Sequence, residues 1–492
     1  MSKRVWKLLT LAGCFLILSA GTVMAEAPVH FADANLKAAV ERELGISDPT
    51  PTDMLALTFL EAWSGISDLT GIEYASNLTH LYLNANQISD ISPLSGLTNL
   101  THLSLGENQI SNLIPLSGLT NLTHLYLSEG NPISDISPLS GLTNLTFLSI
   151  GYLQINDISA LSGLTGLTVL VLEGNQVISD ISPLSGLTNL TALDLNYNQV
   201  NDISALSGLT NLTRLDLISN PISDISPLSG LTNLTELWLG FNQIRNISAL
   251  SRLTNLTSLS LGYNPISDLS PLSGHTNLTL LGLRYNQISD LSPLSGLTNL
   301  MGLYLSDNQI SDIAALSGLT NLTELSLSDN RINDISALSG LTNLKELMLY
   351  NNQISDISAV SGLTSLRQFF LDNNPLNVEA YCTYLRLIEN NNPRIDLWYD
   401  PNPYPPGSCC ESDFDCDGNV DGTDASTFKL YFGRNPLFYP CNEINSCHGD
   451  FDCDGDSDGT DAALFKEDFG RSEVNNHCPV CEVIDWCNYQ SP

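Results

Sequence analysis

Aspartate residues near the C-terminus have the spacing of metal ligands. Residues 413–424 read DFDCDGNVDGTD and residues 450–461 read DFDCDGDSDGTD, two motifs that begin 37 residues apart. Each motif has oxygen donors at positions 1, 3, 5, 9 and 12 and a glycine at position 6, which is the pattern of a calcium loop. The sequence therefore predicts about two bound calcium ions. The predicted ligands are Asp413, Asp415, Asp417, Asp421, Asp424, Asp450, Asp452, Asp454, Asp458 and Asp461, with Asn419 and Asp456 contributing their backbone carbonyls.

Aromatic residues recur at fixed intervals in the middle of the chain. Phe241, Tyr263 and Tyr285 are 22 residues apart, and Tyr197 lies 44 residues before Phe241. Exposed aromatic and arginine side chains are common anchors of protein interfaces. They predict a protein-binding surface, with ordinary surface residues as the alternative. The predicted set is Tyr197, Arg214, Trp238, Phe241, Tyr263, Arg284, Tyr285 and Tyr304.

Three histidines, His80, His102 and His124, also recur every 22 residues. If they lie side by side, their imidazoles could bind a metal ion or respond to pH near neutrality. Solvated imidazoles without a function are the simpler interpretation. His275 stands where neighbouring segments have leucine, so we expect it to mark a local change in core packing.

No catalytic signature occurs in the sequence. We find no nucleophile elbow, phosphate-binding loop or HExxH metalloprotease motif, and the 7 histidines have no convincing carboxylate or cysteine partners. The formal net charge is −35, from 53 acidic and 18 basic residues, which argues against nucleic acid or anionic lipid as a partner. We therefore predict a binding protein and not an enzyme.

A 22-residue repeat positions the aromatic and histidine residues. It first appears at 78–99 as LTHLYLNANQISDISPLSGLTN and continues to about residue 365. Its apolar positions fit neither a helix nor an alternating strand, so only side-by-side stacking of the copies buries them all. Repeats of fixed period form solenoids. The thirteen full copies begin at Leu78, Leu100, Leu122, Leu145, Leu167, Leu190, Leu212, Leu234, Leu256, Leu278, Leu300, Leu322 and Leu344, and a partial copy begins at Leu366.

Each copy should form a short strand and a return turn. Leucines that alternate over Thr79 to Leu83 predict a strand in a parallel sheet. Ser92 before Pro93 suits an N-cap followed by a short 3₁₀ turn. The recurring asparagine, such as Asn86, should form a buried ladder that bonds backbone groups. The recurring aspartate, such as Asp90, should cap the turns.

Two copies are longer than the others, and one lacks the ladder asparagine. The copies that begin at Leu122 and Leu167 have 23 residues, and the extra residues fall near Gly130 and Val177. We expect small bulges at these points and no break in the solenoid. Leu153 replaces the asparagine in one copy, so that turn should be disturbed locally.

Helical segments should cover the two ends of the stack, which would otherwise expose leucine. The segment Phe31 to Leu44 has apolar residues four apart, with Asp33 as N-cap and Gly45 as stop. At the other end we expect a helix from about Glu379 to Glu389 and a closing apolar segment over 395–399.

The N-terminus has the pattern of a secretory signal. Three basic residues precede an apolar run over 8–18, and small residues end at Ala25, after which cleavage is expected. Lipid attachment at Cys14 is the alternative. No second apolar stretch is long enough to span a bilayer. We therefore predict a secreted or cell-surface protein without a transmembrane segment in its mature form.

Ten of the 11 cysteines lie beyond the repeats. An even number of cysteines in an exported chain predicts disulfides, whose pairing the sequence does not fix. The pair Cys478 and Cys481 could instead be a redox or zinc pair. The disulfide candidates are Cys382, Cys409, Cys410, Cys416, Cys441, Cys447, Cys453, Cys478, Cys481 and Cys487.

These features divide the chain into six segments. They are the signal (1–25), an N-terminal cap with a degenerate first repeat (26–77), thirteen repeats (78–365), a partial repeat with a C-terminal cap (366–400), a proline-rich linker (401–408) and a cysteine-rich tail with the two calcium loops (409–492).

The repeat closely resembles the internalin-type leucine-rich repeat of bacterial surface proteins, on the pattern LxxLxLxxNxI followed by SDISPLSGLTN. This resemblance covers about 29–400 and implies an α/β solenoid, a leucine-rich repeat horseshoe. Short parallel strands would line its concave face, and 3₁₀ turns or loops its convex side. It also implies that the concave face binds another protein without catalysis.

The tail resembles a dockerin, a small α-helical module of the EF-hand type that two calcium ions fold. That resemblance implies docking to a cohesin, although Cys416 and Cys453 inside the loops depart from the pattern. Two alternatives to a simple binding protein therefore remain. One is a docking component of an extracellular assembly, and the other is an enzyme that uses the tail as an anchor.

Overall fold

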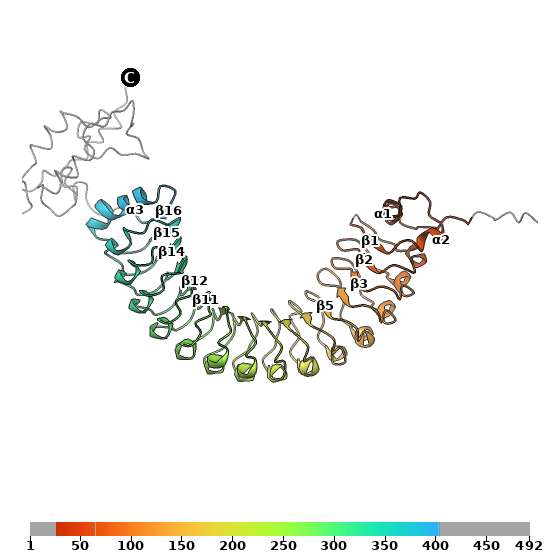
Figure 1. Ribbon diagram of the computed structural model, residues 1–492, viewed down its shortest axis with the longest axis horizontal. Helices are drawn as coiled ribbons and strands as arrows, with labels where there is room; N and C mark the ends of the chain where they lie inside the picture. Colours follow the sequence, from red (N-terminus) through yellow and green to blue (C-terminus); the bar gives the residue numbers. More distant parts are fainter. Residues whose placement is uncertain (1–25, 64, 402, 404–492) are drawn as a thin grey trace, which may run out of the picture.

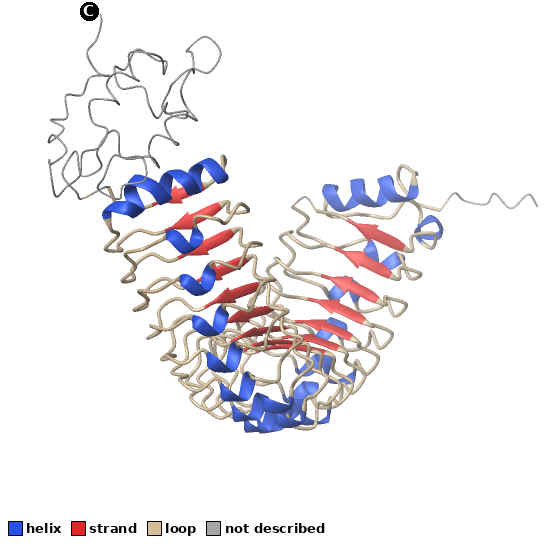
Figure 2. Ribbon diagram, turned by 60° about the vertical axis from the view of Figure 1, so that its left-hand side comes forward, coloured by secondary structure: helices blue, strands red, loops and turns tan. Residues whose placement is uncertain are grey.

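The computed structural model describes residues 26–63, 65–401 and 403. These residues coil into one solenoid whose sixteen strands form a single sheet in chain order, from β1 to β16. All neighbouring strands are parallel. The coils stack into a horseshoe with the strands on the inner side and short helical turns on the outer side (Figures 1 and 2). The predicted solenoid class is confirmed for this part of the chain.

Each strand has three residues. The strands are β1 (Phe59–Glu61), β2 (His80–Tyr82), β3 (His102–Ser104), β4 (His124–Tyr126), β5 (Phe147–Ser149), β6 (Val169–Val171), β7 (Ala192–Asp194), β8 (Arg214–Asp216), β9 (Glu236–Trp238), β10 (Ser258–Ser260), β11 (Leu280–Gly282), β12 (Gly302–Tyr304), β13 (Glu324–Ser326), β14 (Glu346–Met348), β15 (Gln368–Phe370) and β16 (Asp396–Trp398).

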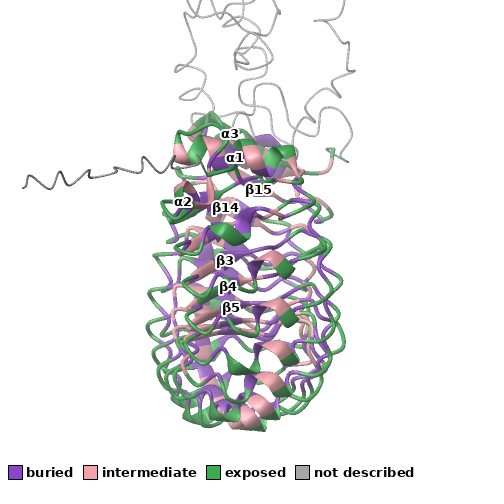
Figure 3. Ribbon diagram, turned by 90° about the vertical axis from the view of Figure 1, so that its right-hand side faces the viewer, coloured by how far each residue is buried: buried purple, intermediate pink, exposed green. Residues whose placement is uncertain are grey.

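The strands are shorter than the predicted span of Thr79 to Leu83. The central residue of β1 to β15 points into the core and is leucine, as Leu81 is, except for Phe369 in β15, and its two neighbours face the inner surface of the horseshoe. The chain then leaves the extended conformation, because Ala85 has a left-handed φ of 54°. In Figure 3, buried residues recur in coil after coil along the stack.

Short 3₁₀ turns form the outer side. They are η1 (Ile72–Tyr74), η2 (Ser92–Leu94), η3 (Ile114–Leu116), η4 (Ser137–Gly141), η5 (Ser159–Leu161), η6 (Ser182–Gly186), η7 (Ser204–Leu206), η8 (Ser226–Gly230), η9 (Ser248–Arg252), η10 (Ser270–Leu272), η11 (Ser292–Leu294), η12 (Ala314–Leu316), η13 (Ser336–Leu338) and η14 (Ser358–Val360).

The prediction that Ser92 is an N-cap is wrong. Ser92 is the first residue of η2, and Ile91 occupies the cap position without a side-chain bond. The carboxylate of Asp90 accepts the backbone N–H of Ser92 at 2.8 Å, so the aspartate row caps the turns as predicted. The carboxylate of Asp90, and not a serine hydroxyl, accepts this N–H because a charged acceptor forms the stronger hydrogen bond.

The asparagine row forms the predicted buried ladder. Asn108 is 4% exposed, and its Nδ2 donates to the carbonyls of Leu83, Leu105 and Gly106 at 2.9, 3.0 and 3.1 Å. Its Oδ1 accepts the backbone N–H of Ile88 at 3.0 Å. One side chain thus bonds four backbone groups where two coils turn, and it joins those coils together.

The longer copies do not interrupt the sheet. Strand β4 pairs with β5 and β6 pairs with β7 in the same register as the other strands. The extra residues are absorbed in the turns, where Gly130 adopts a φ of 69° and Val177 is 51% exposed. Leu153 is buried in place of the ladder asparagine and has no atom that could accept the N–H that an asparagine would bond.

The N-terminal end is covered as predicted. Helix α1 (Ala34–Leu44) packs against β1. Asp33 caps it by accepting the N–H groups of Asn35 and Leu36 at 2.8 and 3.1 Å, and Gly45 ends it with a φ of 66°. A short second helix, α2 (Pro51–Met54), follows.

The C-terminal end differs in part from the prediction. The expected helix over 379–389 begins as a π-helical turn, η15 (Ala380–Tyr384), and continues as α3 (Leu385–Asn391). The segment over 395–399 forms β16 and leaves Trp398 57% exposed, so it adds an edge strand and only partly closes the core. Within the described residues, no helix is long and apolar enough to cross a membrane.

Candidate protein-binding surface

The inner face of the horseshoe carries the residues that vary between copies. The first and third residues of each strand lie on it, and in β11 and β12 one of the two is glycine. The residues three positions after the ends of β7 to β13 form a row beside this face. In that row every residue is in the left-handed region, from Tyr197 (φ 53°) to Asp329 (φ 55°). The repeat therefore fixes the backbone and leaves the side chain free to differ.

Aromatic residues of this row stack on one another. The rings of Phe241 and Tyr263 are 3.8 Å apart between centroids and inclined by 12°, and those of Tyr263 and Tyr285 are 4.1 Å apart and inclined by 15°. Phe241 and Tyr285 are 52% and 46% exposed, and Tyr197, two coils before Phe241, is 49% exposed. We call Tyr197, Phe241, Tyr263 and Tyr285 the aromatic ladder. Stacked rings lose little side-chain entropy on binding, which suits them as interface anchors.

The backbone at the aromatic ladder does not favour aromatic residues. An L-residue in the left-handed region is destabilised by about 1 kcal/mol, with asparagine, aspartate and glycine the usual exceptions. The last four copies follow that preference with Asp307, Asp329, Asn351 and Asn373 at the same position. The middle copies place large rings there instead. Aromatic residues that the backbone disfavours and that solvent reaches point to a role on the surface.

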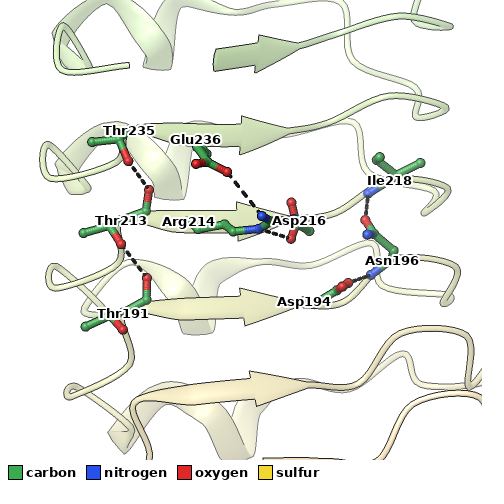
Figure 4. Close-up of polar contacts among 9 residues, drawn as sticks. All are labelled: Thr191, Asp194, Asn196, Thr213, Arg214, Asp216, Ile218, Thr235 and Glu236. Carbon is green, nitrogen blue, oxygen red and sulfur yellow. Dashed lines mark hydrogen bonds and ion pairs between the residues drawn. The ribbon is translucent and has the colours of Figure 1, made fainter. Parts of the chain in front are cut away.

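A charged cluster lies on the neighbouring strands β7, β8 and β9 (Figure 4). The Arg214 Nε donates to Asp216 Oδ2 at 2.8 Å, and its Nη1 lies 3.3 Å from Glu236 Oε2. Asp216 is only 4% exposed, and burial raises the pKa of its carboxyl group. Arg214 is therefore partly neutralised within the protein, although we predicted it as a free contact for a partner.

Asp194 is the carboxylate of this cluster that lacks a cation. It pairs in register with Asp216 on the next strand and accepts the backbone N–H of Asn196 at 2.9 Å. Burial, followed by the charges of Asp216 and Glu173, raises the pKa of Asp194 to about 7. Asp194 forms no ion pair with any residue that the structure describes.

The other predicted contact residues do not join the aromatic ladder. Trp238, on β9 beside Asp216, is only partly exposed, and its buried Nε1 finds no acceptor among the described residues. Tyr304, on β12, donates its hydroxyl to Glu324, and burial followed by this bond raises its pKa to about 12. Arg284 is exposed next to Tyr285.

The carboxylates Asp194 and Asp216 were missing from the predicted set. Their signal was present in the sequence, because the same outward position has aspartate in these two consecutive copies and in no other full copy.

The three histidines stack as a second row. His80 and His102 are 4.3 Å apart and His102 and His124 are 4.2 Å apart, with interplanar angles of 12° and 10°. The Thr101 hydroxyl donates to the Thr79 carbonyl, so the Nδ1–H of His102 must donate to Thr101 Oγ1 at 3.0 Å. Burial and the neighbouring imidazoles lower the pKa of His102.

This stacking does not favour a metal site. Parallel rings aim their Nε2 lone pairs in the same direction, whereas a shared ion needs lone pairs that converge. No group of three metal-binding side chains occurs within residues 26–63 and 65–401. A response to pH stays a prediction. His275 is fully buried, with its ring nitrogens 3.2 and 3.1 Å from the carbonyls of Leu272 and Leu250, so the predicted local repacking is confirmed.

Comparison with known families decides the class of the repeat. A family described as leucine-rich repeats (two copies) matches nine segments, some of them overlapping, that together cover most of 76–381: 76–119, 98–141, 120–163, 143–186, 188–230, 232–274, 276–318, 302–340 and 342–381. The match covers more than half of the chain. The chain belongs to the leucine-rich repeat family.

Solved structures of bacterial leucine-rich repeat proteins are similar to this one. An internalin (InlF) from Listeria monocytogenes is 38% identical with a TM-score of 0.63, over 68% of this chain and 99% of its own. A leucine-rich repeat protein from Leptospira interrogans is 25% identical with a TM-score of 0.63, over 71% and 97%. The functional domain of InlJ from Listeria monocytogenes is 26% identical with a TM-score of 0.56, over 69% and 78%. No curated protein matches the sequence.

The remaining predicted sites of this leucine-rich repeat protein lie elsewhere. The two calcium loops, the signal segment and nine of the ten disulfide candidates are outside the described residues. Cys382 is 7% exposed within η15. Calcium binding and disulfide formation therefore stay predictions.

Asp194→Asn should stabilise the leucine-rich repeat domain at pH 8. The folded-state pKa is raised from 3.8 to about 7, so the contribution of Asp194 to stability is present below pH 3.8 and is lost as the pH rises to about 7. We expect a gain of about 1 to 2 kcal/mol at pH 8, after allowance for partial solvent screening, and almost none at pH 3.5. Urea unfolding at both pH values measures it.

Asp180→Asn is the matched control for this prediction. A hydrogen bond from the Ser182 backbone lowers the pKa of the exposed Asp180, so its stabilising effect is present at pH 8 and is lost as the pH falls. Its neutral variant should therefore not stabilise the protein at pH 8. Equal behaviour of the two variants would contradict the assigned burial of Asp194.

Proposed function

We propose that this leucine-rich repeat protein is exported and captures another protein on the inner face of its horseshoe. The observation that carries the proposal is the exposed aromatic ladder, which is held in place by a backbone conformation that other copies fill with aspartate or asparagine. Similarity to internalins supports it, because leucine-rich repeats typically serve as scaffolds for protein interaction and not as enzymes. The N-terminal signal pattern supports export.

Phe241→Ser should reduce capture of the partner about tenfold or more. Phe241 ends the exposed stack, and loss of an aromatic anchor typically weakens a protein interface by about 2 kcal/mol. Immobilised full-length protein and variant are compared by quantitative mass spectrometry of the proteins that each retains, after equal melting temperatures have been verified.

Ile114→Ser is the matched control for that experiment. Ile114 is an apolar residue on the outer turn η3 and is 66% exposed, so its loss removes a similar apolar area from the opposite face. It should leave capture unchanged. If both variants retain as much partner as the unmodified protein, the inner face is not the binding surface.

We also propose that the tail binds about two calcium ions. The support is chemical, since each loop offers carboxylate oxygens at five ligand positions and a glycine at position 6, and calcium prefers oxygen donors. When bound, calcium would neutralise part of the negative charge of the tail. The role of Asn419 and Asp456 would be to supply backbone carbonyls.

The dockerin-like spacing of the two loops supports a second candidate, a docking component of an extracellular assembly. It predicts a calcium-dependent complex with cohesins. Mixing the full-length protein with a panel of cohesins, with and without chelator, tests this version. Absence of any calcium-dependent complex would remove it and would leave capture by the repeats untouched.

A further inference from the structure

The aromatic ladder has one interruption. Tyr197 and Phe241 are two coils apart, and Ser219 holds the position between them with the same left-handed backbone, at φ 57°. Phe241 and Tyr285 are also two coils apart, and they hold the ring of Tyr263 between them at 3.8 and 4.1 Å. A two-coil separation in this row therefore accommodates one planar group. We call the position at Ser219 the ladder gap.

Four charged residues lie on the strands β7 to β9 that lead to the ladder gap, and three of them are acidic. Arg214, on the same coil as Ser219, is already paired with Asp216 and Glu236. Asp194 precedes Tyr197 by three residues on β7, and it has no ion-pair partner within the described part of the chain. The Tyr152 hydroxyl donates to Glu173 at 2.8 Å. That bond and burial, followed by the charges of Glu173, Tyr197 and Asp194, raise the pKa of Tyr152 to about 12. A ligand at the gap would lie between the rings of Tyr197 and Phe241, next to Asp194 and Asp216 on the two strands that lead to this part of the row.

The charge excludes several occupants of the ladder gap. Residues 404–492 have 18 acidic and 4 basic side chains, a net charge of −14, so the tail of this chain would be repelled. A second copy, with a net charge of −35, is disfavoured for the same reason. A divalent cation lacks a site, because no group of three suitable ligands exists within the described residues.

The shape of the ladder gap and the charge around it together favour a planar cation as its occupant. A guanidinium group stacks on aromatic faces and bonds carboxylates through a fixed set of donors, whereas the ammonium group of lysine is compact and strongly hydrated. We propose that the protein partner presents a basic segment whose arginine side chain enters the ladder gap between Tyr197 and Phe241 and pairs with Asp194. This inference rests on the proposed capture of a protein by the inner face and specifies the chemistry of that partner.

Synthetic peptides test the proposal without knowledge of the natural partner. Three peptides of equal length carry arginine, lysine or glutamine at alternate positions, and their binding to the full-length protein is measured by calorimetry at low salt. We expect the arginine peptide to bind about threefold or more tightly than the lysine peptide, and the glutamine peptide to show no binding. Asp194→Asn should weaken the arginine peptide about tenfold.

Ser219→Tyr fills the ladder gap and is the decisive variant. Tyrosine is tolerated at this backbone conformation in three other copies of the same row, so the variant should fold. It should abolish the preference for arginine over lysine, since every carboxylate is retained and only the gap is lost. Ser219→Asn, a small residue suited to left-handed φ, should keep the preference.

Two results would overturn the inference. One is an unchanged preference for arginine in Ser219→Tyr, and the other is equal binding of the arginine and glutamine peptides. In either case, the proposed function would still be supported if Phe241→Ser no longer retained the proteins that the unmodified protein captures. If instead the arginine preference depends on Ser219 while Phe241→Ser retains full capture, the gap binds arginine but the proposed capture surface is wrong.

Discussion

Asn264→Ala should lower the free energy of unfolding by about 2 to 4 kcal/mol. Asn264 is 4% exposed, and its Nδ2 donates to the carbonyls of Leu239, Leu261 and Gly262 at 2.9, 3.1 and 3.2 Å. Its Oδ1 accepts the N–H of Ile244 at 2.9 Å. Alanine leaves the N–H of Ile244 buried without a partner, which typically destabilises by about 1 to 3 kcal/mol. Each of the three carbonyls loses one of its two bonds and keeps the other, from Asn242, Asn286 or the Phe241 N–H, so these losses are smaller.

Asn255→Ala, at the end of the preceding copy, provides the comparison. The exposed Asn255 makes one side-chain bond, from its Nδ2 to the carbonyl of Thr232 at 2.9 Å, so its loss should change stability by less than about 1 kcal/mol. Urea unfolding measures both variants, and hydrogen exchange at the Ile244 amide should accelerate only in Asn264→Ala. Similar losses for the two variants would mean that the ladder does not join the coils as described.

The double variant Asp417→Ala, Asp454→Ala should abolish calcium binding. Each aspartate occupies position 5 of its loop, where the carboxylate oxygen is a direct ligand in calcium loops of this spacing. Loss of a direct ligand should weaken each site by more than about 100-fold, because even groups that only support ligands contribute about 10- to 100-fold. Calorimetry should show about two sites in the unmodified protein and none in the variant.

A control removes carboxylates from the repeats. Asp290 and Asp312 cap outer turns by accepting the N–H groups of Ser292 and Ala314, both at 2.8 Å, so neither is placed to bind calcium. The double variant Asp290→Ala, Asp312→Ala should keep about two sites. If the tail variant binds calcium as well as the unmodified protein does, the two loops are not the calcium sites.

The sequence predicts the scaffold because most scaffold residues have a local physical reason, which in the repeats recurs in nearly every copy. The buried leucines, the asparagine ladder and the cap at Asp33 all follow from spacing and local hydrogen bonding. Errors arise where two nearby side chains could form a hydrogen bond with the same backbone group. Ser92 and Asp90 can both bond the start of a 3₁₀ turn, and only the geometry shows that the carboxylate does so.

The binding surface is less predictable, since it depends on distances between copies and not within one. The period places Phe241, Tyr263 and Tyr285 in one row, but their stacking depends on side-chain rotamers that the pattern does not specify. The raised pKa of Asp194 requires knowledge of its burial and of the charges on neighbouring coils. The sequence predicts Arg214 as a contact for a partner, but it does not show that Arg214 forms ion pairs with Asp216 and Glu236.

Site-specific photocrosslinking at the aromatic ladder tests the central claim most directly. Benzoylphenylalanine is introduced at Tyr263 in one protein and at Ile114, on the outer turn, in another, and each is irradiated with the proteins captured by the unmodified chain. Tyr263 lies inside the exposed stack, so we predict a crosslinked partner from that position and none from Ile114. Crosslinking from Ile114 with none from Tyr263 would contradict the assignment of the inner face as the binding surface.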